Sequence, residues 1–258
     1  MLIGLFVGGL GAIVGSFLNV CIHRLPRGES IVAPSSHCPG CKKPIGWYDN
    51  IPLLSYLLLR GRCRSCGKRI PFRYFLVEFL TAAFFAALYV VFGLSPHLLS
   101  GCVLTGLLMA ATFVDFERQE IPDEVSLGGI VIGLVISAVF PDLMGAEARW
   151  VSLARSFAGA LAGGAVIYAV GFLAECIFKK EAMGGGDVKL LAMIGSFVGW
   201  QMAILTFFIA PLFGSIVGIV MRIRHGSETI PYGPYLSMAA MTAFIFGNNI
   251  LAYLFYGL

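Results

Sequence analysis

Charged residues are scarce in this chain of 258 residues, where Asp, Glu, Lys and Arg together make up 12% of the sequence. A soluble domain typically carries about 25%. Hydrophobic residues account for 58% of the chain. So few charged groups cannot cover the surface of a water-soluble domain of this size. The composition therefore excludes an ordinary soluble protein and indicates that lipid is the solvent.

Several further features are missing. No Lys or Arg precedes the first apolar run and no small-residue cleavage site follows it. A secretory signal peptide needs both a basic segment before its apolar run and a cleavage site after it. We therefore expect this run to be a retained first span. The chain lacks the Gly-rich strand-turn-helix pattern of soluble methyltransferases. It also lacks the inverted repeat found in many transporters.

Long apolar segments, by contrast, follow one another along the whole chain. A transmembrane helix needs about 20 mainly apolar residues. The boundary between the sixth and seventh segments, at Gly199–Gln201, is the least marked in the sequence. We predict an all-α integral membrane protein with about eight transmembrane helices. These lie near 2–22, 73–93, 98–114, 125–141, 153–178, 188–200, 202–221 and 235–257.

The Lys and Arg residues predict the orientation of these spans. With the N-terminus outside, sixteen of the eighteen lie in inward loops or at their edges, and only Arg149 and Arg155 lie outside. Such a bias marks the cytoplasmic side. A basic patch can also bind RNA or anionic lipid, but topology explains this one more simply, and we expect no nucleic-acid partner. The inward loops are 23–72, 115–124, 179–187 and 222–234.

Four cysteines in the first inward loop form two CxxC pairs, Cys38/Cys41 and Cys63/Cys66. Two such knuckles can supply the four thiolates of a tetrahedral site. Disulfides are the alternative, but the reducing cytoplasm disfavours them. We expect a structural zinc site, with iron as the main alternative metal. A loop of this length has little core of its own, so the metal would supply much of its folding energy.

Two aspartates sit where predicted spans meet the cytoplasm. Asp115 ends the third span, and Asp187 opens the sixth after Gly184–Gly186. Two neighbouring carboxyl groups that share a proton can act as the base and acid of an aspartyl protease. The glycines would let an extended substrate approach closely, but they could equally form a flexible turn before a capped helix. Asp123 competes with Asp115, although a helix cap explains it well.

The motifs that carry a family resemblance span nearly the whole chain. They are Gly15-Ser-Phe-Leu-Asn-Val20 with His23-Arg-Leu-Pro26, the segment from Cys38 to Glu78, Val114-Asp115 with Ile121-Pro-Asp123, Gly184-Gly-Gly-Asp187-Val-Lys189, and Pro231-Tyr-Gly-Pro234. Together they resemble type IV prepilin peptidases. Tyr232 departs from the Phe common in that family. The presenilin-like proteases, which share the GxGD motif, would show a Pro-Ala-Leu segment that this chain lacks.

The resemblance implies an enzyme of the bacterial inner membrane, with its active site facing the cytoplasm. It would remove the basic leader of type IV prepilins or pseudopilins and then methylate the new N-terminus with S-adenosylmethionine. The family pattern selects Asp115 and Asp187 as catalytic. We expect Gly184, Gly185, Gly186 and Lys189 to support the substrate or this pair. The family pattern divides the chain into a first helix, 1–22, a loop tied to methylation, 23–72, and a peptidase part, 73–258. A transporter that uses intramembrane carboxylates is the alternative function.

Overall fold

The computed structural model describes residues 2–38, 40–179, 184–225 and 231–256. Within these ranges the chain is helical, and its only β structure is two isolated bridges, His37 with Pro44 and Arg62 with Arg69. The predicted all-α class is therefore confirmed. The chain divides into two compact units, Met1–Ala110 and Ala111–Leu258.

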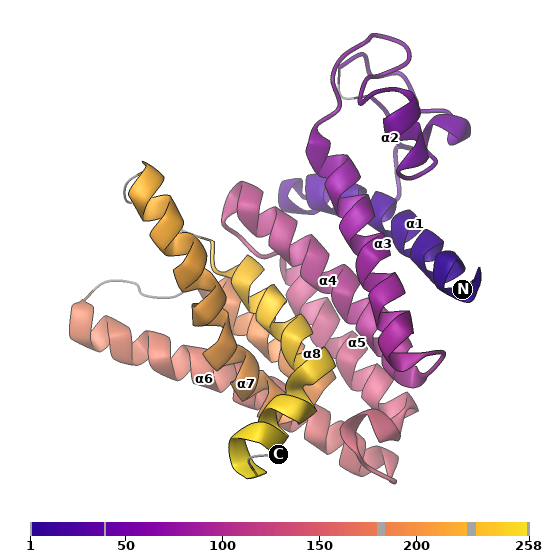
Figure 1. The fold of residues 1–258 in the computed structure, drawn as a ribbon. Coiled ribbons are helices and arrows are strands. Elements are labelled where there is room, and N and C mark those ends of the chain that lie inside the picture. Colours follow the sequence, from indigo (N-terminus) through magenta and orange to yellow (C-terminus); the bar gives the residue numbers. More distant parts are fainter. Residues whose placement is uncertain (1, 39, 180–183, 226–230, 257–258) are drawn as a thin grey trace. The chain divides into compact units, whose positions relative to one another are not determined.

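The N-terminal unit is built on two long helices, α1 (Leu2–Arg24) and α3 (Phe72–Phe92). Between them runs an irregular loop that contains two 3-10 turns, Leu25–Arg27 and Trp47–Asp49, and the short helix α2 (Leu54–Leu58). Figure 1 shows this loop beyond the N-terminal end of α3. Helix α4 (Pro96–Arg118) begins in the N-terminal unit and ends in the C-terminal unit.

Glycines bring α1 close to α3. A Cβ atom on Gly11 would lie 2.8 Å from the carbonyl oxygen of Thr81, and one on Gly15 would lie 2.7 Å from the Cα of Glu78. Only glycine at these positions lets the two backbones approach so closely, as in other membrane helix pairs. The opposite face of α1 exposes large apolar side chains such as Leu5 and Phe6. Helix α1 is thus suited to face protein on one side and lipid on the other.

The C-terminal unit contains the end of α4, α5 (Asp123–Val139), α6 (Arg149–Phe178), α7 (Gly185–His225) and α8 (Gly233–Tyr256), with a 3-10 turn at Pro141–Met144. Helices α6 and α7 make the most extensive contact in this unit. A Cβ on Gly159 or Gly195 would overlap the other helix. The Ser156 hydroxyl also donates to the Ser196 carbonyl across this contact, at 2.6 Å. Close packing and a buried hydrogen bond therefore hold the pair together.

The predicted number of eight spans is not confirmed. Among the described residues, six helices are long and apolar enough to cross a membrane. Helix α5 has only 17 residues. The expected spans at 188–200 and 202–221 fall within one assigned helix, α7, which Gly199 interrupts with a left-handed φ of 79°. The chain is nevertheless a multi-pass membrane protein.

Candidate functional site

Asp115 lies in the last turn of α4 and is only 6% exposed. Its Oδ2 atom accepts a hydrogen bond of 2.9 Å from the backbone N–H of Gly233, the first residue of α8. The first N–H groups of a helix have no partner within the helix and carry partial positive charge. The Asp115 carboxylate therefore satisfies a free donor of α8, and the helix in turn stabilises the buried negative charge.

Asp187 occupies the first turn of α7, directly after the three glycines. Its backbone N–H donates to the carbonyl oxygen of Gly184 at 3.1 Å. The N-terminal end of a helix favours an acidic side chain. A Cβ on Gly186 would lie 3.3 Å from the Cβ of Ile121, whereas one on Gly185 would meet nothing within 4 Å. Gly186 thus packs against the segment that follows α4.

The fold brings the two aspartates together, although they are far apart in the sequence. Their carboxyl groups lie within electrostatic range of each other, and Asp187 also acts on the phenol of Tyr232. Burial and then the Asp187 charge raise the pKa of Tyr232 to about 12. Its hydroxyl is buried without a hydrogen-bond partner within the described structure. Tyr232 is therefore a protonated donor beside the Asp187 carboxyl group.

Asp123, the rival of Asp115, sits apart on the surface. It opens α5, and its Oδ1 atom lies 2.6 Å from the Nζ atom of Lys189 on α7. Both side chains are exposed, at 57% and 41%. An exposed pair of this kind adds little stability. Burial therefore distinguishes the two aspartates where spacing could not, and it favours Asp115.

Gly233 and Tyr232 were not singled out as site residues by reasoning from the sequence. Their segment, Pro231-Tyr-Gly-Pro234, entered only as part of the family resemblance. One signal was available, because a Gly-Pro turn that opens a helix presents unpartnered backbone N–H groups. The identity of the acceptor, Asp115, depends on a contact across 118 positions.

The four cysteines of the N-terminal unit form two turns with the same backbone pattern. In the first, the Cys38 N–H donates to the Lys43 carbonyl, and the Lys42 N–H donates to the Cys38 carbonyl. In the second, Cys63 makes the equivalent bonds with Lys68 and Gly67. Lys42 and Gly67 occupy the same position and both have positive φ, 60° and 70°. The two CxxC segments are thus matched knuckles.

The thiol groups fit a tetrahedral metal ion. The four Sγ atoms lie within 4.8 Å of one another, and those of Cys38 and Cys66 are 3.8 Å apart. Four ligands at about 2.3 Å from zinc place their sulfurs about 3.8 Å apart. Backbone N–H groups of Cys41 and Gly40 outweigh the opposing effect of burial and lower the pKa of the Cys38 thiol to about 6. That favours the thiolate form, which ligates metal, at Cys38. At Cys66, the Lys68 backbone N–H lowers the pKa, but burial and hydrogen bonds with the other three thiols outweigh it and raise the pKa to about 11.

Two family descriptions together cover most of the chain. Residues 10–92 match "Bacterial Peptidase A24 N-terminal domain", and residues 102–219 match "Type IV leader peptidase family". The first match contains the cysteine knuckles, and the second contains both Asp115 and Asp187. No solved structure matches the chain.

Curated relatives resemble the chain over nearly its full length. A protein of Aeromonas hydrophila named "Prepilin leader peptidase/N-methyltransferase" is 37% identical, over 92% of this chain and 88% of its own. Proteins of the same name from Pseudomonas aeruginosa and Neisseria gonorrhoeae are 35% and 33% identical. In both cases the match covers 93% of this chain, and it covers 89% and 90% of the relatives.

Proposed function

Because this chain belongs to the type IV leader peptidase family, we propose that Asp115 and Asp187 are the catalytic pair of its peptidase. The protein is a prepilin leader peptidase with N-methyltransferase activity. The observation that supports the proposal is the electrostatic proximity of two carboxyl groups. One is that of Asp187 in the first turn of α7, and the other is that of Asp115, which accepts a hydrogen bond from the first N–H of α8. Family membership gives no support to the transporter alternative.

The pair would act on a water molecule and the scissile peptide bond. Because two close carboxyl groups do not both ionise readily, one keeps a proton. The ionised group removes a proton from water as the water oxygen attacks the peptide carbonyl carbon, and the protonated group donates to the carbonyl oxygen. When the C–N bond breaks, the leaving nitrogen takes up a proton and becomes the new N-terminal amine.

The three glycines and Lys189 take supporting roles in this proposal. Gly184–Gly186 form the turn that places Asp187, and Gly186 packs on Ile121 beyond the end of α4. Lys189 reaches Asp123 rather than a buried carboxyl group, so it links the beginning of α5 to the first turns of α7. It would therefore stabilise the arrangement around Asp187 without touching the substrate.

The remaining assignments concern the location of the enzyme, its substrates and methyl donor, the roles of the two parts of the chain, and the metal. We place the catalytic pair at the cytoplasmic face of the inner membrane, as the positions of Lys and Arg support. The substrates would be type IV prepilins or pseudopilins, and S-adenosylmethionine would donate the methyl group. Residues 23–72 would serve methylation and residues 73–258 peptide cleavage. Zinc held by Cys38, Cys41, Cys63 and Cys66 would stabilise the loop, since four protein ligands leave no open position for substrate.

Cleavage of a prepilin by purified protein in detergent tests the catalytic pair. We expect Asp115→Asn and Asp187→Asn each to abolish leader removal, because an amide neither accepts the proton from water nor provides the shared proton. Asp123→Asn is the matched control. It breaks only the exposed pair with Lys189 and should leave most of the activity. Full cleavage by either of the first two variants would refute the proposal.

A further inference from the structure

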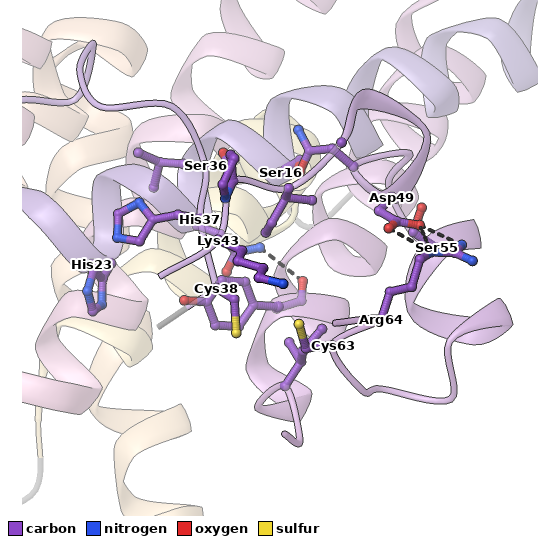
Figure 2. A pocket seen from close by; sticks show the side chains of 18 of the residues that line it. Ser16, His23, Ser36, His37, Cys38, Lys43, Asp49, Ser55, Cys63 and Arg64 are labelled. Carbon is purple, nitrogen blue, oxygen red and sulfur yellow. Dashed lines mark hydrogen bonds and ion pairs between the residues drawn. The ribbon is translucent and has the colours of Figure 1, made fainter. Parts of the chain in front are cut away.

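A cavity of about 660 Å³ lies in the N-terminal unit, where α1 and α3 meet the loop that connects them (Figure 2). All of its lining residues fall between Ser16 and Glu78. Small-molecule sites in proteins typically measure about 300–1,000 Å³. The cavity is thus large enough for a ligand that joins a nucleoside to an amino acid.

The helix side of this cavity carries a buried acceptor that has no partner. Asn19 on α1 is 2% exposed, and its Nδ2 atom donates to the Tyr74 carbonyl at 3.0 Å. Its Oδ1 atom has no hydrogen-bond partner within the described structure. An unsatisfied buried acceptor costs about 1–3 kcal/mol. Since Asn19 lines the cavity, a ligand with an N–H or O–H group could satisfy this oxygen.

Glu78 on α3 adds a second acceptor to the same wall. It is 9% exposed, and its Oε2 atom accepts a bond of 2.7 Å from the Leu53 N–H. The Glu78 carboxylate also accepts a hydrogen bond from the Ser16 hydroxyl. No cation lies within ion-pair distance of Glu78 in the part of the chain that the structure describes. A carboxylate has about four lone-pair sites, so Glu78 retains capacity for hydroxyl or ammonium donors from a ligand.

The loop side of the cavity has the opposite character. Its lining includes Lys42, Lys43, Lys68 and Arg69. Figure 2 shows Lys43 close to Cys38. Arg64 also lines the cavity, but its guanidinium group is already paired with Asp49. Two aromatic rings, those of Tyr56 and Tyr74, also line the cavity. The site thus combines buried acceptors on one side, aromatic surface, and basic groups that can bind a carboxylate on the other.

We propose that this cavity is the S-adenosylmethionine site of the enzyme. The ribose hydroxyls and adenine amine can donate to the unpartnered Oδ1 atom of Asn19 and to the remaining lone pairs of Glu78, and the carboxylate of the methionine moiety suits the lysines. The inference rests on the proposed use of S-adenosylmethionine as methyl donor. In that reaction the methyl carbon leaves sulfur, which keeps the electron pair, and bonds to the pilin amine, which releases a proton to solvent.

Binding and labelling of the full-length protein in detergent test this assignment. Equilibrium dialysis should show a Kd for S-adenosylmethionine that is about tenfold higher in Glu78→Gln and in Asn19→Leu, as expected for losing one strong hydrogen bond. Glu147→Gln, an exposed residue of the other unit, is the matched control and should bind like wild type. Thermal unfolding of each variant checks that it folds.

A second measurement avoids variants. Wild-type protein is irradiated with methyl-labelled S-adenosylmethionine and digested, and we expect the label on peptides between residues 16 and 78. If wild type transfers methyl groups while the label maps elsewhere, or while both variants keep the wild-type Kd, the cavity assignment fails and the proposed donor stands. If wild type neither binds S-adenosylmethionine nor transfers its methyl group, the proposed donor fails as well.

Discussion

Gly233→Ala is the sharpest probe of the catalytic pair, because it leaves both carboxyl groups in the chain. The added Cβ would lie 2.7 Å from Asp115 Oδ2 and 3.3 Å from its Cγ. Real Cβ atoms do not approach so closely, so the carboxyl group must move away from α8. That movement removes the 2.9 Å hydrogen bond from the Gly233 N–H.

The size of the effect follows from that bond. A hydrogen bond to a charged group contributes about 1.5–3 kcal/mol. If Asp115 needs this bond to hold its reactive position, the loss raises the barrier by the same amount. Since about 1.4 kcal/mol corresponds to a tenfold change in rate, kcat/KM for leader removal should fall by about 10- to 150-fold.

The assay compares cleavage rates of one prepilin by wild type, Gly233→Ala and a matched control. Gly128→Ala is that control, because a Cβ at Gly128 of α5 meets nothing within 4 Å. It should cleave at the wild-type rate. A Gly233→Ala enzyme that folds and retains wild-type kcat/KM would show that the contact between α8 and Asp115 does not support catalysis.

Three further predictions concern other contacts. Tyr232→Phe should lower kcat by about tenfold with little change in KM, because it removes a protonated donor beside Asp187. An unchanged kcat in steady-state cleavage would contradict this role. Metal analysis should find about one zinc per chain. Cys66→Ser should abolish that binding and lower the unfolding temperature, whereas Cys176→Ser, outside the quartet, should not. Gly195→Leu should destabilise the protein by about 1–3 kcal/mol, because the side chain overlaps α6. In thermal unfolding, Gly9→Leu, which has open space, should behave like wild type.

The sequence predicted the features that depend on residue type and local order. Scarce charge and long apolar runs required a helical membrane protein, and two CxxC pairs predicted four clustered thiols. The number of spans was not determined in this way. Gly199 interrupts α7 by its backbone conformation alone, and a glycine within an apolar run does not reveal in the sequence whether a helix ends or bends.

Only the tertiary structure separated the candidate carboxylates by their surroundings. Asp115 and Asp123 are close in sequence and both border apolar segments, yet one is buried against Gly233 and the other is paired on the surface with Lys189. Neither partner can be identified from spacing, because each contact depends on how distant helices pack. By itself the sequence determined which chemical groups are available in the membrane. Packing decided which carboxyl group lost contact with water and gained a helix N-terminus in its place.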